Sequence, residues 1–453
     1  MAKVSDLRSF LGALRERGRL FDIEREVDPV GELGAVLHAA QQRECAVLFH
    51  RVKGHQMPVF AGGLGFAEGV GAALGCAPGE IGERMASAFH HPLPPILEDQ
   101  PAAQEVILRD GIDLPVRFPV PTHAPEDAGP FITGGVAVTR DPASGRHNLS
   151  FNRMQLYGGA DAGFSINEWR DVGTFLEASR GTHGPLPVCV AIGVDPVLQI
   201  AAACRYPGDE YEIAGALRGE PVPVVRALCS DVLIPANAEI VLECEVFPDE
   251  RRVEGPMAEF TGHYSDATPK HVAHVRAVTH RRDPIFQTVA GGGREHVNLG
   301  NTLPREPLVR TAVERVCRRV RAVHLPPYAG GFLALVSLDR DHPGEVRNVG
   351  LAALTAHINI KVAIVVDTDV DIYNPADVFW AVCTRVRADQ DILTVPRVQG
   401  HELDPTAADR GLLTKVVIDA TLDPAQRQHF RKVVYPQVEL EQYLQPARNR
   451  VLK

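Results

Sequence analysis

Apolar positions recur along the chain with two different periods, and these periods predict its elements. Helical spacing marks residues 6–17 and 30–42, and a short apolar run at 47–50 predicts a strand. A further helical pattern lies at 169–179. Turn residues separate five segments that have the composition and alternation of β-strands: 131–141, 148–158, 187–196, 239–248 and 271–281.

Residues 91–130 are rich in proline and form the first long irregular stretch, because proline removes amide donors and disfavours helix before it. Residues 303–322 predict a strong helix that begins at a proline and ends before Leu325-Pro-Pro-Tyr. Strands and helices then alternate, which is typical of a compact α/β domain. We therefore divide the chain into a large N-terminal domain, a linker helix and a C-terminal domain: 1–302, 303–324 and 325–453.

Composition narrows the classes of protein. The chain has 453 residues, of which 45% are hydrophobic, so it can bury a large core and is neither disordered nor fibrous. A net charge of −10 gives no global electrostatic reason to bind nucleic acid or an anionic membrane. No apolar run is long enough for a transmembrane helix, the first residues lack a signal peptide, and the eight cysteines form no CxxC pair. We expect a cytosolic protein with reduced cysteines.

The first group of candidate catalytic residues consists of an arginine and two glutamates. On the strand at 148–158, Asn148, Ser150 and Asn152 share one face, and Arg153 lies on the other unless a bulge intervenes. Glu254-Gly-Pro-Met-Ala-Glu259 places a turn between two carboxylates, which lets them converge on one site. Paired carboxylates beside an arginine suit proton transfer. The alternatives are an arginine in an ordinary salt bridge and two solvated glutamates.

A second candidate is the acidic cluster Asp209-Glu210-Tyr-Glu212 before a predicted helix. Its oxygens suit Mg²⁺, Mn²⁺ or Ca²⁺, although acidic residues at this position also simply complement a helix dipole. Two other motifs are excluded. The aspartates at 367–371 lack the glycine and distal glutamate of a calcium loop, and the glycines at 291–293 lack the spacing of a dinucleotide fingerprint.

Several segments together resemble the UbiD family of decarboxylases: NLSFNR, EGPMAEFTGHY, GDEYEIAGALRG, PTHAPEDAGPFITGGVAVTRDP and VAIVVDTDVDIYNPADVFWAVCTR. They span about residues 110–400 in the family's order. The resemblance implies an α/β (α+β) fold with a flavin-binding domain around a mainly antiparallel, split-barrel-like sheet, a linker helix and a C-terminal α/β oligomerisation domain. It also implies reversible, non-oxidative decarboxylation of aromatic, heteroaromatic or α,β-unsaturated acids with prenylated FMN, which a separate flavin prenyltransferase supplies.

The resemblance also assigns residues. The catalytic network is implied to be Arg153, Glu254 and Glu259, with Glu259 as the proton donor. Mn²⁺ or Mg²⁺, with K⁺ nearby, is implied to join the flavin phosphate to Asn148 and Glu210. The remaining residues implied to bind the cofactor are Ser150, Phe151, Asn152, Arg153, Cys204 and Lys415.

One position departs from the family. Aligning the tryptophan of INEWRDVGTFLEASRG puts Asn167 where the family usually has a metal-binding histidine. An amide oxygen is a weaker donor to transition metals than imidazole. Asn167 is therefore a metal ligand, or a water takes its place, or the metal dependence differs.

These observations leave three functions open. The leading one is a decarboxylase that acts on a small carboxylic acid and releases CO₂. The others are a carboxylase and a non-catalytic flavin-binding or assembly subunit. We expect Met154, Met257 and Phe260 near the substrate. We also expect a homodimer or a higher homo-oligomer formed through the helix that carries Phe379 and Trp380, unless these two are core residues of the monomer.

Overall fold

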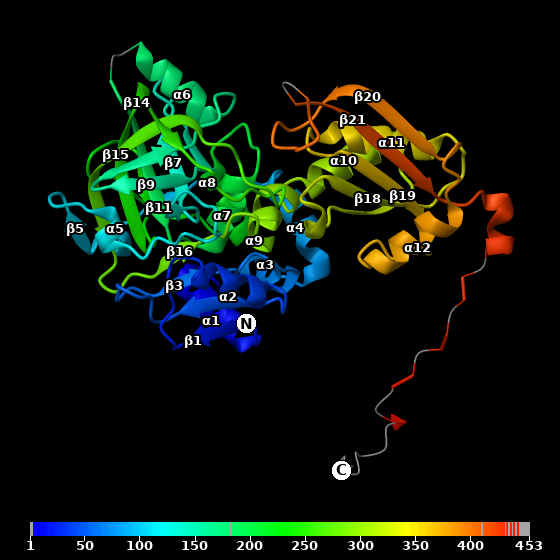
Figure 1. Cartoon of the computed structure of the whole chain (residues 1–453), viewed down its shortest axis with the longest axis horizontal. Helices are drawn as coiled ribbons and strands as arrows, with labels where there is room; N and C mark the ends of the chain where they lie inside the picture. Colours follow the sequence, from blue (N-terminus) through cyan, green and yellow to red (C-terminus); the bar gives the residue numbers. More distant parts are fainter. Residues whose placement is uncertain are drawn as a thin grey trace.

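The computed structural model describes residues 3–181, 184–408 and 411–430, and the pairs 432–433, 435–436, 438–439 and 442–443. It has the predicted mixed α/β class, with a large N-terminal part and a smaller C-terminal part side by side (Figure 1). No helix within the described ranges has the length and apolar character needed to cross a membrane.

The N-terminal part is built around a nine-stranded sheet, which confirms the expected mainly antiparallel sheet. All of its strand pairs are antiparallel, and its two longest strands, β14 and β15, pair with each other in the middle of the sheet (Figure 1). In spatial order the strands are β6 (Phe131–Ile132), β9 (Met154–Gly158), β10 (Asp161–Phe164), β15 (Thr268–His280), β14 (Ile240–Glu254), β11 (Leu186–Ile192), β7 (Val136–Arg140) and β8 (His147–Phe151), with β5 (Val106–Leu108) also on β15.

The first hundred residues form a cap beside this sheet. The predicted helix at 6–17 is α1 (Leu7–Glu16), and Asp6 is its N-cap. The Asp6 carboxylate accepts from the Ser9 amide, and Ser9 Oγ accepts from the Asp6 amide. The predicted strand at 47–50 is β2. The other elements of this region are β1 (Leu20–Ile23), α2 (Glu32–Gln41), β2 (Ala46–Phe49), β3 (Val59–Ala61), α3 (Ala67–Leu74), α4 (Ile81–Ala88) and β4 (Ile96–Leu97).

Helices that follow β10 and β11 shape one side of the cavity described below. Helices α7 and α8 pack against each other and both contact β8. Within α7, consecutive residues are buried, since it lies between the sheet and the cap. The elements are α5 (Leu114–Arg117), α6 (Asp171–Arg180), α7 (Pro196–Ala203), α8 (Glu210–Arg218), β12 (Pro223–Arg226), β13 (Leu233–Pro235), β16 (Phe286–Thr288), α9 (Arg294–Val297) and the π-helix η3 (Asn298–Thr302).

The predicted helix over 303–322 is wrong in its extent. Helix α10 covers only Glu306–Val316, and Val320–His324 form strand β17, which pairs with β18 of the C-terminal sheet. Val320 and Val323 are buried there, so the apolar residues that extended the helical pattern in sequence serve a strand instead. Local propensity was overridden by this burial.

The C-terminal part is a five-stranded sheet with helices on both faces. The sequence pattern had predicted an α/β domain here but not how the helices are distributed over the sheet. Helices α10 and α11 pack on one face and α12 on the other (Figure 1). In spatial order the strands are β17 (Val320–His324), β18 (Leu333–Leu338), β19 (Val362–Asp367), β21 (Leu412–Ala420) and β20 (Ile392–Gln399), and the helices are α11 (Glu345–Ala356) and α12 (Pro375–Arg385).

Candidate active site

A cavity of about 1250 Å³ lies between the two parts of the chain. Strand β8, the segment at 165–170 after β10, helices α6 to α8 and the segment at 257–271 supply most of its wall. Residues 399–403, around the end of β20, reach it from the C-terminal part. Ligand sites of small molecules commonly measure about 300–1000 Å³. The cavity is therefore large enough for a cofactor and a small substrate together.

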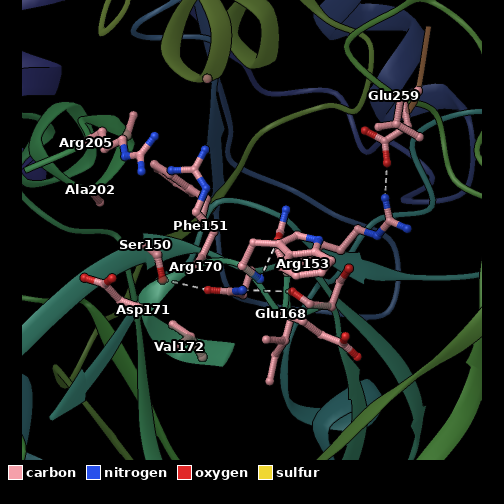
Figure 2. A pocket seen from close by; sticks show the side chains of 18 of the residues that line it. Ser150, Phe151, Arg153, Glu168, Arg170, Asp171, Val172, Ala202, Arg205 and Glu259 are labelled. Atoms are coloured by element: carbon pink, nitrogen blue, oxygen red, sulfur yellow. Dashed lines mark hydrogen bonds and ion pairs between the residues drawn. The ribbon is translucent and has the colours of Figure 1, made fainter. Parts of the chain in front are cut away.

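Arg153 joins two glutamates at the wall of this cavity. Its Nε donates to Glu254 Oε1 at 2.8 Å, and its Nη1 donates to Glu259 Oε1 (Figure 2). Arg153 lies on neither face of the expected strand, because it is outside the strands: β8 ends at Phe151, and β9 begins after Arg153. The structure thus brings the three residues of the predicted network together.

The two glutamates are not equivalent. Glu254 is fully buried at the end of β14, and its Oε2 has no hydrogen-bond partner among the described residues. Burial raises the pKa of Glu254, although the adjacent Arg153 opposes this rise. Glu259 lines the cavity, whereas Glu254 lies behind it. Of the two carboxyl groups, Glu259 is therefore the one in reach of a ligand.

Glycines hold the segment that carries Glu259. A Cβ at Gly291 would lie 2.3 Å from the Ala258 carbonyl oxygen, and Gly292 has a φ of +69°. Only glycine allows this close approach and this conformation without strain. The glycines at 291–293, which do not form a dinucleotide fingerprint, thus support the backbone beside Glu259.

Asn148 and Glu210 meet elsewhere on the cavity wall. Asn148 Nδ2 donates to Glu210 Oε1 at 3.2 Å, and the Leu149 amide donates to Glu210 Oε2 at 2.9 Å. Glu210 opens α8, and Asp209 caps this helix by accepting from the Tyr211 amide. Burial raises the pKa of Glu210 to about 8. A buried carboxylate without an ion-pair partner in the described chain suits a bound cation.

Asn167 lines the same cavity but lies exposed on it. Its Oδ1 accepts from the Trp169 amide at 3.0 Å, so this oxygen has a partner within its own turn. Asp171, which no sequence motif had indicated, also lines the cavity, and its charge adds to the rise in the pKa of Glu210. Arg146 Nη2 holds Asp171 at 2.9 Å. The sequence feature that could have indicated Asp171 is an acidic residue at the start of a predicted helix, here α6.

The other predicted cofactor residues divide into two sets. Ser150, Phe151, Asn152 and Cys204 all line the cavity, and Ser150 Oγ donates to Asn152 Oδ1 at 2.7 Å. Burial raises the pKa of the Cys204 thiol to about 12, so it stays protonated. Lys415 is not on the cavity wall: its Nζ donates to the Leu354 carbonyl at 2.9 Å within the C-terminal part.

Two histidines that the sequence analysis missed lie near Glu259. The ring centroid of Phe260 lies 5.2 Å from that of His401 and 6.3 Å from that of His296. Both histidines line the cavity. Of the residues expected near the substrate, Met257 lines the cavity, whereas Met154 is a core residue. Histidines distant in sequence and without ligand spacing gave no signal.

No group of three His, Cys, Asp or Glu side chains suited to a metal occurs in the described ranges of the chain. A cation at Glu210 would therefore need an amide oxygen, such as that of Asn148, or oxygens from a bound ligand. Phosphate oxygens and carboxylates are the ligands that Mg²⁺ and Mn²⁺ favour. The donor set fits a cation that also contacts a phosphorylated cofactor.

Comparisons with known families cover nearly the whole chain. Family models of 3-octaprenyl-4-hydroxybenzoate carboxy-lyase match in chain order: its N-terminal domain at residues 11–89, its Rift-related domain at 96–294 and its C-terminal domain at 299–420. These are the three domain models of UbiD.

Named relatives are similar over almost their full lengths. The anhydromevalonate phosphate decarboxylase of Methanosarcina mazei is 33% identical over 95% of this chain and 99% of its own. The gallate decarboxylase of Lactiplantibacillus plantarum is 30% identical over 97% of this chain and 99% of its own.

A solved structure is also similar. The UbiD-class enzyme HmfF of Pelotomaculum thermopropionicum, in complex with FMN, has a TM-score of 0.92 and 36% identity, covering 97% of this chain and all of that one. An evolved dimeric form of HmfF, in complex with prFMN, has a TM-score of 0.90 and 34% identity, with 97% and 100% covered.

Proposed function

The chain belongs to the UbiD family of carboxy-lyases, and on this premise we propose that it uses prenylated FMN to decarboxylate an aromatic, heteroaromatic or α,β-unsaturated acid reversibly and without oxidation. The observation that carries this proposal is Arg153, held between Glu254 and Glu259 at the wall of a cavity large enough for a cofactor and a substrate.

The chemistry explains why a cofactor is needed. Loss of CO₂ from an sp² carbon leaves a carbanion that no side chain can delocalise. Prenylated FMN, when bound, supplies the electron sink. The protein must then orient the acid, exclude water and deliver a proton to the carbon that CO₂ leaves.

We assign the proton delivery to Glu259. It lines the cavity, whereas Glu254 lies behind it, and Glu254 Oε2 has no hydrogen-bond partner among the residues that the structure describes. Arg153 stays charged and fixes the carboxyl group of Glu259 through Nη1 while Nε holds Glu254. Glu254 thereby orients the guanidinium, and Arg153 orients the proton donor. In the carboxylation direction the same group accepts the proton.

Asn148 and Glu210 would hold a divalent cation, Mn²⁺ or Mg²⁺ with K⁺ nearby, against the flavin phosphate. Their position on the cavity wall supports this role, as does the buried carboxylate of Glu210, which forms no ion pair with another described residue. Ser150, Phe151, Asn152 and Cys204 would contact the rest of the cofactor. We assign the remaining metal position to Asp171 or Asn167, with Asp171 favoured because the Asn167 oxygen already accepts a hydrogen bond.

We further propose a homodimer formed through the C-terminal part. Phe379 of α12 is 58% exposed, so it is not a core residue of the monomer. Trp380 beside it is half-buried under Lys432 and Arg385. An exposed aromatic residue on a helix of a small domain suits a contact with a second copy. Light scattering on the full chain and on Phe379→Ser tests this contact, which a monomeric wild type would refute.

Co-expression with a flavin prenyltransferase tests the reaction. The purified protein should carry the absorption of prenylated FMN and release CO₂ from members of a panel of aromatic and α,β-unsaturated acids. Protein expressed without the prenyltransferase is the control and should be inactive. A loaded protein that releases no CO₂ from any acid, and carboxylates none of the products at high bicarbonate, would refute the proposal.

A further inference from the structure

The two glutamates that share Arg153 have more negative charge than this arginine can balance. Glu254 and Glu259 carry two negative charges when both are ionised, and Arg153, which bonds to both, supplies one positive charge. Glu254 is fully buried, and its Oε2 has no hydrogen-bond partner among the described residues. Buried charges are normally paired, because removing them from water is costly. A second cation close to Glu254 Oε2 would balance the group.

The strand pairing locates this oxygen beside Lys270. Glu254 of β14 lies opposite Thr268 of β15, the strand that separates β14 from β10. A Cβ at Gly163 of β10 would lie 3.2 Å from Glu254 Oε2, so the Glu254 side chain reaches across β15. Gly163 lies opposite Val272 of β15. Because side chains alternate between the faces of a sheet, Lys270 is the residue between Thr268 and Val272 on the face that Glu254 crosses.

Lys270 is a cation without a partner of its own. It lines the cavity, is half-buried, and forms no hydrogen bond or ion pair with another described residue. Burial raises the pKa of Glu254, and the charges of Arg153 and, more weakly, of Lys270 oppose this rise. A lysine ammonium is a compact point charge on a flexible stem, so it acts on a neighbouring carboxylate without a fixed bonding geometry.

The other charged and titratable side chains around Glu254 have different partners. Arg252, which lies opposite Lys270 in the strand pair, places its guanidinium over the ring of Tyr157, 4.1 Å from the ring centroid. The Tyr157 hydroxyl donates to the Val253 carbonyl at 3.0 Å. Burial and the charge of Glu254 raise the pKa of Tyr157, so its phenol stays neutral. These contacts leave Lys270 as the second cation for Glu254.

We propose that Lys270 is a positioning residue of the proton-delivery site. With Arg153, it balances the charge of Glu254, so that the proton donor can ionise without leaving an excess of buried negative charge. When Glu259 delivers its proton, its O–H bond breaks, the product carbon gains the proton and Glu259 becomes a carboxylate. Two cations then face two carboxylates, and the group is neutral. The inference rests on the proposed decarboxylation, because it assigns a role in the proton transfer that follows CO₂ release.

The pH dependence of turnover in the cofactor-loaded protein tests this role, with an acid that the panel identifies as a substrate. Lys270→Met removes a positive charge, so the two coupled carboxyl groups should keep their protons to higher pH. The alkaline limb of the turnover profile, where the proton donor ionises, should move up by about one pH unit. Lys270→Arg keeps the charge and should restore the wild-type profile. Arg252→Met removes a charge from the facing position and should leave the limb in place.

Infrared spectroscopy of the full-length, cofactor-free protein measures the same charge without turnover. In a Glu259→Gln background, the absorption of the protonated Glu254 carboxyl group is identified by its loss in Glu254→Gln. Adding Lys270→Met should make this absorption persist to a pH about one unit higher. Lys270→Gln is a second uncharged variant, which decides the question if Lys270→Met does not fold. An unchanged titration of Glu254, or a shift of the same size in Arg252→Met, would overturn the inference.

The two proposals fail separately. If the Glu254 titration shifts as expected but the cofactor-loaded protein releases no CO₂ from any acid, the proposed reaction is refuted and the charge balance by Lys270 is kept. Conversely, CO₂ release by Lys270→Met with the pH profile of the wild type would refute the role of Lys270 and keep the reaction.

Discussion

Two regions of the cavity wall balance their charges in different ways. At one, the carboxylates of Glu254 and Glu259 share Arg153, so the protein alone supplies both signs of charge. At the other, Glu210 is buried with hydrogen bonds from Leu149 and Asn148 but no ion pair in the described chain. We propose that the first region is preorganised for proton transfer and that a bound cation completes the second.

Removing the positive charge of Arg153 should have the largest effect on stability and turnover. Arg153→Met leaves two carboxyl groups without a partner, and breaking a buried pair in this way typically lowers the free energy of unfolding by about 3–5 kcal/mol. Turnover should be lost with it, because Glu259 is no longer held. Urea unfolding and CO₂ release measure the two effects.

Arg153→Lys is the matched control, since it keeps the charge without the fork geometry. It should recover most of the stability and little of the turnover. Wild-type stability in Arg153→Met would show that the two regions do not differ as described.

Removing the carboxylate from the incomplete region should instead empty it. Glu210→Ala should purify with little Mn²⁺ and little flavin, while the isolated protein remains folded, because no ion pair in the described chain is broken. Metal analysis and the flavin absorption of the purified protein measure this loss. The control Glu212→Ala changes a carboxylate two residues further along α8, and this variant should retain both Mn²⁺ and flavin. Full Mn²⁺ in Glu210→Ala would place the metal site elsewhere.

The smallest effect that we expect is a change with pH in the free energy of unfolding of the cofactor-free protein, caused by Glu210. Burial raises the pKa of Glu210 to about 8 from an ordinary value of 4.5, so between these values the folded chain keeps a proton that the unfolded chain releases. The free energy of unfolding should therefore fall as the pH rises from about 4.5 to about 8.

Added Mn²⁺ should raise the melting temperature more at pH 8 than at pH 6, because binding requires the ionised carboxylate. Glu210→Gln cannot ionise, so it should flatten this part of the profile and abolish the response to Mn²⁺. If the free energy of unfolding of Glu210→Gln and of the wild type changed identically with pH, Glu210 would not have a raised pKa in the folded protein.

The sequence predicted the elements whose burial follows a local period. Helix α1 appears where the apolar pattern placed it, since it buries one regular face. Strands β14 and β15 also appear where apolar runs predicted them, since consecutive residues of each are buried. The prediction of the C-terminal end of the linker helix was wrong because Val320 and Val323 lie in a strand that pairs with the next strand, β18, and are buried there. Such pairing leaves no trace in a local pattern.

The candidate site divides in the same way. Arg153, Glu254 and Glu259 were found because they stand within recognisable motifs, and Glu210 was found through its acidic cluster. Asp171 and His401 were missed because only the packing of α6 and of the loop after β20 around one cavity gives them a shared role. Lys415 had a plausible place in the sequence, but its amine bonds within the C-terminal part.

Solvent deuterium in the product of Glu259→Gln tests the central assignment most directly. In D₂O the cofactor-loaded wild type should place one deuterium on the carbon that CO₂ leaves. The variant should still bind prenylated FMN, yet lose about 10²–10⁴-fold in turnover, and in deuterium incorporation with it, because general acid catalysis contributes that much. Near-normal turnover with full deuterium incorporation in Glu259→Gln would contradict the account, since the proton would then come from another group.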